Sequence, residues 1–318
     1  MSVNVRRQLV ESCPVCGDRG VKRSRVLTDL SGLVEGNFTS EQCRCGVHWL
    51  RDPVTSEDIS LAYSEDYYSF QNALSTGLRS FMDEVRKWLF RARYQSHSPS
   101  LVRALSAQLP GYPPGGEPGR VLDVGCGNGA RLRWLQTAGW ECVGVDVSAK
   151  AVAVGKASGL NLFVADAAVL PFPDEHFDSV VMCHAIEHCS DPRRVIREVA
   201  RVLEPGGSLV VTTPNGSSPV ARTFGTMWVN WDAPRHYLVF DISSLGTLLA
   251  SEGFSIRSTR GSSTGWSWEP SLGHALKNRA IELPRFARMI IRGVFTPAAL
   301  IFNMSSRADE FEIVATKR

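Results

Sequence analysis

Three parts of this sequence carry residues whose types and spacing can do chemistry. They are a glycine-rich segment with an acidic start at 123–129, a histidine and glutamate cluster at 184–188, and four cysteines between 13 and 45. Glycine-rich turns bind ligands through the main chain, histidines and carboxylates exchange protons or hold metals, and thiolates bind zinc. Each part therefore predicts a site, and the rest of the chain must supply the elements that position it.

The glycine-rich segment, Asp-Val-Gly-Cys-Gly-Asn-Gly, follows an apolar run at 120–124 and opens a helical pattern at 130–138. Glycines there let the backbone turn tightly and let a ligand approach the main chain, and the first helical amides stay free to bind it. A dinucleotide site would have Gly-x-Gly-x-x-Gly, but the third glycine here comes one residue early. The negative charge of Asp123 is unfavourable beside a pyrophosphate and suits a cationic ligand such as the ammonium group of a methionine moiety.

A second carboxylate, Asp146, stands at the end of the next apolar run. At that place in a sheet a carboxylate can accept hydrogen bonds from both hydroxyls of a ribose. Helical patterns, for instance 130–138 and 191–203, separate the apolar runs. The runs are 120–124, 142–147, 160–164, 179–183 and 208–212, followed by two more at 254–260 and 311–316.

Runs that are apolar throughout suit strands buried on both faces, and their alternation with helices predicts a parallel sheet with right-handed crossovers. We therefore expect an α/β fold. It is a doubly wound, seven-stranded Rossmann-like sheet with a small N-terminal zinc segment and helical additions.

Four motifs follow one another in the second half of the chain: VLDVGCGNG, VGVDVS, VADAAVLPFPDEHFDSVVMCHAIEHCSDP and REVARVLEPGGSLVVTTPN. In order and spacing they resemble the class I S-adenosylmethionine-dependent methyltransferase family, bacterial type with an N-terminal zinc-knuckle segment, over roughly 120–260. The resemblance implies an enzyme that takes S-adenosylmethionine as its cofactor. A nucleotide-binding fold with another ligand is the alternative.

The resemblance also implies roles for individual residues. The glycine turn faces the methionine part of the cofactor, the carboxylate after the second strand holds the ribose, the one after the third strand contacts the adenine amine, and the loop after the fourth strand closes over the cofactor. The implied cofactor-binding residues are Asp123, Gly125, Cys126, Gly127, Asp146, Val147, Asp166, Ala167 and His184.

The histidine cluster, His184-Ala-Ile-Glu187-His188, has two further interpretations. It spells the His-x-x-Glu-His of inverted zinc peptidases, but that motif should lie within a helix, and here it straddles a strand end. Glu-His followed by Asp-Pro is also widespread in the methyltransferase family, where it can simply shape the loop and start the next helix.

A functional interpretation adds His236, in the segment beyond the fifth strand. Quinone-ring and small-RNA 3′-end O-methyltransferases resemble this part and bind a divalent metal through Glu-x-x-Glu-His and a downstream histidine. The corresponding candidates are Glu187, His188 and His236, although His184 replaces the first glutamate. We expect these three residues to be catalytic, with His236 as general base or acceptor-positioning residue. The alternative is a histidine that only packs the lid.

The cysteine cluster combines Cys13-Pro-Val-Cys16-Gly with Cys43-Arg-Cys45-Gly. Four thiolates on two short loops suit a tetrahedral structural Zn²⁺, which has no open position for catalysis. The second pair is one residue shorter than Cys-x-x-Cys. Disulfides among the eight cysteines are the weaker prediction, because a cytosolic enzyme keeps its thiols reduced.

We expect a zinc-knuckle segment at 1–60, a helical linker or cofactor cover at 61–118, and a methyltransferase core at 119–318 with a helical insertion near 265–307. The boundary before the core is the Pro- and Gly-rich stretch 110–119, which breaks regular structure. Two kinds of aromatic residue have open roles. Tyr67 and Tyr68 either cover the cofactor or anchor the zinc segment, and four tryptophans either stack on the acceptor or pack the lid. Those tryptophans are Trp228, Trp231, Trp266 and Trp268.

The features that indicate the methyl acceptor are less specific than those that indicate the cofactor. A basic amphipathic stretch at 274–307 either lies on an anionic membrane surface or packs on the core as a lid helix. No Asn-Pro-Pro-Tyr type motif follows the fourth strand, which disfavours methylation of base amino groups. We expect methyl transfer to a hydroxyl, less so to carbon or nitrogen, of a small-molecule or lipid-linked acceptor such as a sugar or quinone-like metabolite.

Two alternative functions belong to other classes of protein. The first is an RNA-directed methyltransferase that docks through the zinc segment, but a net charge of +3 over 318 residues argues against nucleic acid. The second is a catalytically silent cofactor-binding protein, which need not keep the cofactor site. We find no signal peptide and no convincing transmembrane run, and expect a cytoplasmic protein with peripheral contact to the inner face of the membrane as an option.

Overall fold

The structure of the protein is a computed structural model. The structure describes residues 3–63, 87–88, 90–95, 110–262, 267–277 and 307–318, with a few single residues between 281 and 291. Tyr67, Tyr68, Trp266 and most of the basic stretch 274–307 lie outside the described residues. In the described part of the chain no helix is both long enough and apolar enough to cross a bilayer.

The larger sheet has seven strands in the order β10-β11-β8-β7-β4-β5-β6. The strands are β4 (Arg120–Val124), β5 (Glu141–Asp146), β6 (Leu162–Val164), β7 (Phe177–Cys183), β8 (Leu203–Pro214), β10 (Phe254–Gly261) and β11 (Glu310–Lys317). β4 to β8 are parallel, and β11 lies antiparallel between β8 and β10. The predicted seven-stranded α/β fold is confirmed.

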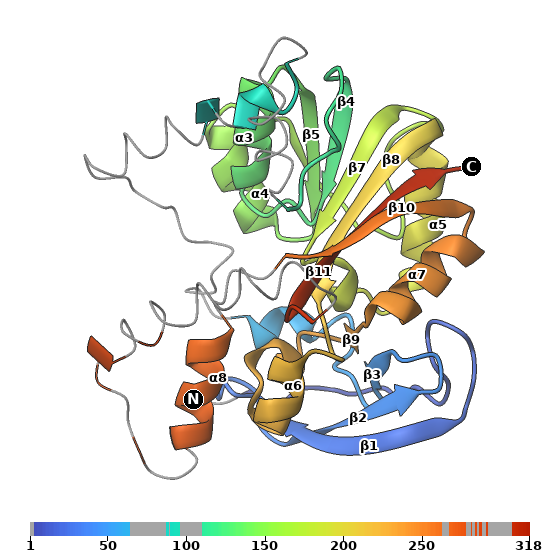
Figure 1. Cartoon of the computed structure of the whole chain (residues 1–318). Coiled ribbons are helices and arrows are strands. Elements are labelled where there is room, and N and C mark those ends of the chain that lie inside the picture. The colour runs from blue at the N-terminus through green and yellow to red at the C-terminus, as the bar shows by residue number, and fades with distance from the viewer. Residues whose placement is uncertain are drawn as a thin grey trace.

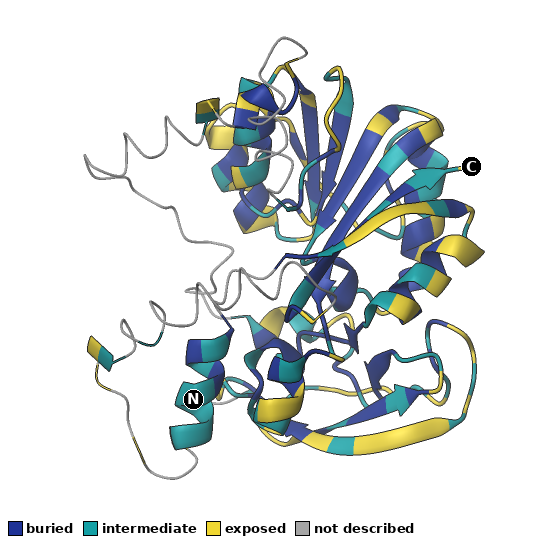
Figure 2. Ribbon diagram, in the orientation of Figure 1, coloured by how far each residue is buried: buried dark blue, intermediate teal, exposed yellow. Residues whose placement is uncertain are grey.

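Helices cover both faces of this sheet (Figure 1). α3 (Ala130–Thr137) and α4 (Ala149–Ala157) lie on one face, and α5 (Pro192–Val202) and α7 (Ile242–Ser251) on the other. Successive residues of a strand point to opposite faces, so Val121 packs in the cluster beneath α3 and Leu122 in the cluster beneath α5 and α7. Figure 2 shows the central strands buried almost throughout, as continuous apolar runs require.

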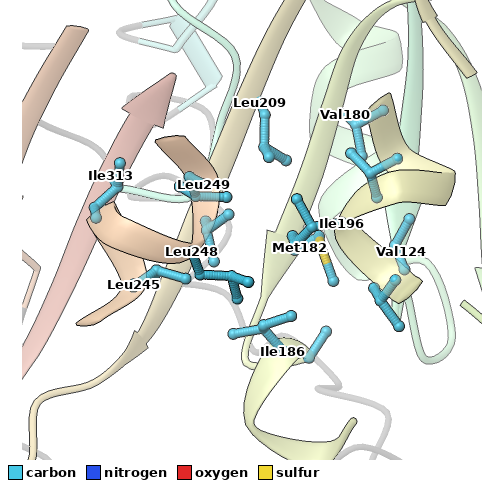
Figure 3. Close-up of a cluster of buried hydrophobic side chains, with 14 of the residues drawn as sticks. Val124, Val180, Met182, Ile186, Ile196, Leu209, Leu245, Leu248, Leu249 and Ile313 are labelled. Atoms are coloured by element: carbon cyan, nitrogen blue, oxygen red, sulfur yellow. The ribbon is translucent and has the colours of Figure 1, made fainter. Parts of the chain in front are cut away.

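The core beneath α5 and α7 is the larger of the two (Figure 3). Leu245, Leu248 and Leu249 recur at helical spacing along α7 and meet side chains of the sheet. α5 begins where the side chain of Asp191 accepts a hydrogen bond from the amide of Arg194, with Pro192 in the first turn. This helix start follows directly after the histidine cluster and fixes where the loop must end.

A second, four-stranded sheet has the order β1-β2-β3-β9. Its strands are β1 (Val21–Thr28), β2 (Asn37–Cys43), β3 (His48–Leu50) and β9 (Leu238–Val239), all paired antiparallel. β9 comes from the chain that follows β8, so the N-terminal strands are hydrogen-bonded directly to the segment that carries His236. The sequence did not predict this pairing.

Two of the four tryptophans pack in a hydrophobic cluster between the small sheet and α6 (Pro219–Phe224). Trp228 is 0% and Trp231 3% exposed, and both share the cluster with Leu27 and Phe38. The structure therefore favours lid packing for these two residues over stacking on an acceptor. Trp268 opens α8 (Trp268–Lys277) and packs against the same cluster.

Candidate functional site

The glycine-rich turn joins β4 to α3 at the carboxyl ends of the parallel strands. Gly125 and Gly127 have φ values of +76° and +54°, in the left-handed region that glycine enters without strain. A Cβ atom on Gly125 would lie 2.7 Å from the Cβ of Ala185, so the turn also packs closely against the loop after β7. From β4 the chain continues to β5 on one side and returns to β7 on the other. Ligands of open α/β sheets bind at such a switch point.

Carboxylates stand at the ends of the next two strands. The Oδ2 of Asp146 accepts a hydrogen bond from the amide of Gly127, and Oδ1 from the amide of Ser148, each at 2.8 Å. These two amides hold the carboxylate at the end of β5, beside Val147, whose side chain is 74% exposed. Asp166 follows β6 and accepts a hydrogen bond from the amide of Ala168 at 2.8 Å.

Asp123 is buried at the end of β4, with only 2% of its surface exposed. Burial raises the pKa of its carboxyl to about 6, against the opposing charge of Arg131 and with a further increase from Asp146. The Nε of Arg131 lies 3.7 Å from Asp123 Oδ2, which is too long for a strong hydrogen bond. A cationic ligand group at this carboxylate would compensate for its burial.

These groups fit S-adenosylmethionine. A buried carboxylate suits an ammonium group, a carboxylate at the end of β5 suits the ribose hydroxyls, and the glycines leave room for a ligand against the main chain. The structure brings all the predicted cofactor-binding residues of β4, β5 and β6 to one edge of the sheet. His184, also predicted there, comes from the neighbouring end of β7.

The histidine cluster begins where β7 ends, and only a single turn of 3-10 helix, η3 (Ile186–His188), follows. His184 has a φ of +52°, an unfavourable conformation for a side-chain-bearing residue, and its amide donates to the carbonyl of Thr212 at 2.9 Å. His184 and His188 therefore do not share one face of an α-helix. This geometry excludes the arrangement of an inverted zinc peptidase.

Glu187, His188 and His236 come together although His236 is distant in sequence. One potential ligand atom from each residue lies within 4.8 Å of the other two. The two imidazole rings meet edge to face, with centroids 4.6 Å apart. His236 reaches this place from the segment between the 3-10 helix η5 (Val229–Trp231) and β9.

Both histidines are oriented by main-chain carbonyl groups. The Nδ1 of His188 lies 3.0 Å from the carbonyl oxygen of Arg235, and the Nδ1 of His236 lies 2.8 Å from that of Asn230. A carbonyl oxygen only accepts hydrogen bonds, so each Nδ1 carries a proton and Nε2 is the ring nitrogen left to bind a metal or to exchange a proton. Burial, followed by the neighbouring His236, lowers the pKa of His188 to about 4, and this ring is neutral at pH 7.

Glu187 is fully buried between two partners. Its Oε1 lies 3.2 Å from the Nδ1 of His184, and its Oε2 accepts a hydrogen bond from the hydroxyl of Thr213 at 3.0 Å. Burial alone would raise the pKa of Glu187, but His184 and the two other histidines lower it to about 2. Burial likewise opposes charge on His184, yet the carboxylates of Glu187 and Glu310 raise the pKa of this histidine well above 6.5. The pair is therefore ionised, with His184 as the cation.

The trio of Glu187, His188 and His236 can act in two ways. One carboxylate and two imidazole Nε2 atoms, whose Nδ1–H groups are bound to carbonyls, form a donor set that divalent transition metals accept. The same orientation leaves His236 Nε2 free to accept a proton, with Asp232 Oδ2 3.9 Å away to stabilise the resulting charge.

The four cysteines of the N-terminal segment also converge. Their sulfur atoms all lie within 4.8 Å of one another, with Cys13 3.8 Å from Cys45 and Cys16 3.4 Å from Cys43. Zinc bound tetrahedrally by thiolates, with bonds of about 2.3 Å, separates its sulfurs by about 3.8 Å. All eight cysteines of the chain are unpaired, so none of these thiols is consumed by a disulfide.

Several residues of the site carry no signal in the sequence. Arg235 forms ion pairs of 2.8 Å with Asp29 and 2.6 Å with Asp232, and donates to the carbonyl of Ala62. These contacts fix the segment whose carbonyl orients His188. The hydroxyl of Tyr63 also lies 3.3 Å from the Nδ1 of His188. Apart from the pair with Asp232, these contacts join parts of the chain that are far apart in sequence.

The family model of a methyltransferase domain matches residues 94–259, just over half of the chain. The chain belongs to the S-adenosylmethionine-dependent methyltransferases. This confirms the family, enzyme class and fold expected from the four motifs.

Curated relatives match about a third of the chain. The chain is 37% identical over 109 residues to a demethylmenaquinone methyltransferase of Corynebacterium efficiens, which covers 34% of this chain and 46% of that protein. It is 34% identical over 129 residues to the ajmaline N-methyltransferase of Rauvolfia serpentina, over 36% of this chain and 44% of that protein. The chain thus spans about half the length of the curated relatives it matches.

A solved structure of an S-adenosylmethionine-dependent methyltransferase from Mesorhizobium loti is 22% identical, with a TM-score of 0.46. The match covers 69% of this chain and 98% of that chain.

Proposed function

We propose that the protein transfers the methyl group of S-adenosylmethionine to a hydroxyl of a small-molecule or lipid-linked acceptor. The observation that carries this proposal is the orientation of His236, whose Nδ1–H is bound to the carbonyl of Asn230 so that Nε2 is a proton acceptor. A hydroxyl is a weak nucleophile until its proton is removed, whereas a neutral amine needs no such base.

The cofactor supplies an electrophilic methyl group on a sulfonium. Asp123 and the glycine turn would hold its methionine part, Asp146 its ribose, and Asp166 its adenine. His236 would take the acceptor's proton as the new carbon–oxygen bond forms and the carbon–sulfur bond breaks. The carboxylate of Asp232, 3.9 Å from Nε2, would stabilise the protonated ring.

The residues around His236 also fit a divalent metal. As the alternative to the general base, Glu187, His188 and His236 would bind this metal, which would polarise the acceptor oxygen. Nε2 of His236 would then be a ligand and could not accept the proton. The names of the relatives cover a quinone and an alkaloid nitrogen, so they favour a small metabolite without choosing the acceptor.

We also propose that Cys13, Cys16, Cys43 and Cys45 bind a structural zinc ion. The sulfur separations of 3.4–3.8 Å in the two close pairs support this, because they match a tetrahedral set of thiolates. Cys43 ends β2 and Cys45 stands between β2 and β3, so a zinc ion held there would stabilise the small sheet.

The test of the catalytic proposal is His236→Ala, assayed with an acceptor found by screening hydroxyl-bearing metabolites against methyl-labelled cofactor. We expect the turnover number to fall by roughly 100-fold or more, since a positioned general base contributes about that much. Binding of S-adenosylhomocysteine should not change. The matched control is His176→Ala, because His176 precedes the opposite end of β7.

Added imidazole should restore part of the turnover of His236→Ala, which a packing role for His236 does not predict. Full turnover by His236→Ala in the absence of imidazole would contradict the assignment.

A further inference from the structure

A basic cleft is lined by residues of the small sheet and of α6. Its volume is about 600 Å³, within the size range of small-molecule sites. Four cationic side chains line it, three from β1 and one from α6, and none of the described residues that line it is a carboxylate. These cations are Lys22, Arg23, Arg25 and Arg222.

The sequence pattern of β1 explains why three neighbouring cations reach one cleft. In a regular strand successive side chains alternate between faces, so Lys22 and Arg23 would point apart. The pairing of β1 with β2 shifts between Val21 and Arg23, which is the signature of a β-bulge. A bulge re-aims a side chain, and here it lets Lys22 and Arg23 line the cleft together with Arg25.

Within the described chain these cations have no acidic partner. No carboxylate of a described residue forms an ion pair with Lys22, Arg23, Arg25 or Arg222. The guanidinium of Arg25 lies over the ring of Trp231, 4.4 Å from its centroid, and this contact holds it in place. Burial and the charge of Arg23 lower the pKa of Arg25, as expected where like charges gather without a counter-ion.

His48 also lines the cleft, with 4% of its surface exposed. Its Nδ1 atom has no hydrogen-bond partner among the described residues, and this atom is too deeply buried to be reached from the cleft. Binding of an anion in the cleft therefore depends on the four cations.

The cleft adjoins the proposed catalytic residues. The ring of His48 meets that of Trp231 edge to face at 5.0 Å, and Trp231 directly follows the residue whose carbonyl orients His236. Gly216, at the wall of the cleft, stands three residues beyond Thr213, which donates to Glu187.

We propose that this cleft binds the phosphate or diphosphate group of an anionic small molecule. Several unpaired cations in a concave site require a ligand with more than one negative charge, and guanidinium groups match phosphate oxygens in geometry. That this molecule is the methyl acceptor, held by its phosphate while its hydroxyl meets His236, rests on the function proposed above.

The test measures binding of inorganic pyrophosphate to the full chain by calorimetry at low ionic strength, without methyl transfer. We expect saturable binding at one site, weakened at least roughly tenfold in the double variant Arg23→Gln/Arg222→Gln, because each lost charge-assisted hydrogen bond contributes about that factor. Both residues are exposed, so the variant should fold. The matched control is Arg257→Gln, on the edge strand β10.

S-adenosylhomocysteine is titrated separately into the same proteins, so a failure of the cofactor site is distinguished from a failure of the cleft. Absence of saturable pyrophosphate binding, or equal binding by wild type and the double variant, would overturn the proposal. Binding to vesicles of acidic phospholipid without binding of pyrophosphate would overturn it as well, and would assign the basic surface to a membrane.

Discussion

Replacing Cys13 by serine should remove the metal from the purified protein and unfold the small sheet. Cys13 is buried, 3.8 Å from Cys45, and closes the ring of four sulfurs. Structural zinc sites contribute about 10–16 kcal/mol to folding of the segments that hold them, which matches or exceeds the whole stability of an ordinary domain. The small sheet carries β3, which pairs with β9, so the effect should extend to the segment that holds His236.

Elemental analysis is the direct measurement of this effect. Wild type should contain one zinc per chain, Cys13→Ser close to none, and limited proteolysis should cut the variant within the first sixty residues. The matched control is Cys189→Ser, a cysteine of the core loop that donates to the carbonyl of Ala185. Wild-type protein without zinc, or full zinc in Cys13→Ser, would refute the metal site.

Replacing Asp146 by alanine should weaken binding of S-adenosylhomocysteine by roughly a thousandfold. Two hydrogen bonds from ribose hydroxyls to a carboxylate contribute about 1.5–3 kcal/mol each. The variant also removes the acceptor for the amides of Gly127 and Ser148, which hold the glycine turn in place. Calorimetric titration measures the loss directly.

The control for this variant is Asp174→Ala, an exposed carboxylate that forms an ion pair with Arg201. It should bind the cofactor product as wild type does. An Asp146→Ala variant that binds with unchanged affinity would show that the ribose is held elsewhere.

The core of the fold was predictable because its signals are local. The apolar run at 120–124 coincides with β4, and the other runs overlap the remaining strands, since a strand buried on both faces must be apolar throughout. Asp191 and Pro192 marked the start of α5, because an N-cap residue followed by proline is also a local signal. The four motifs of the methyltransferase family are likewise short continuous segments of sequence, so the family could be predicted before the family model matched.

The surroundings of the histidines were not predictable, because they depend on long-range contacts. The sequence selected Glu187, His188 and His236, yet their orientation depends on the carbonyls of Asn230 and Arg235. A carbonyl is present at every residue, so no side-chain pattern marks the one that a histidine will meet.

The basic cleft was missed for a related reason. Lys22, Arg23 and Arg25 look like a solvated strand in the sequence, and only the bulge in β1 and the position of α6 bring them to one cavity with Arg222.

We propose that the turn at Gly125–Gly127 and the carboxylates of Asp123, Asp146 and Asp166 form a site for S-adenosylmethionine and not for a dinucleotide. Calorimetric titration of the wild-type chain with S-adenosylmethionine, and in parallel with NAD, tests this assignment. We expect saturation at one S-adenosylmethionine per chain and no binding of NAD. No binding of S-adenosylmethionine, or saturable binding of NAD that Asp146→Ala abolishes, would contradict it.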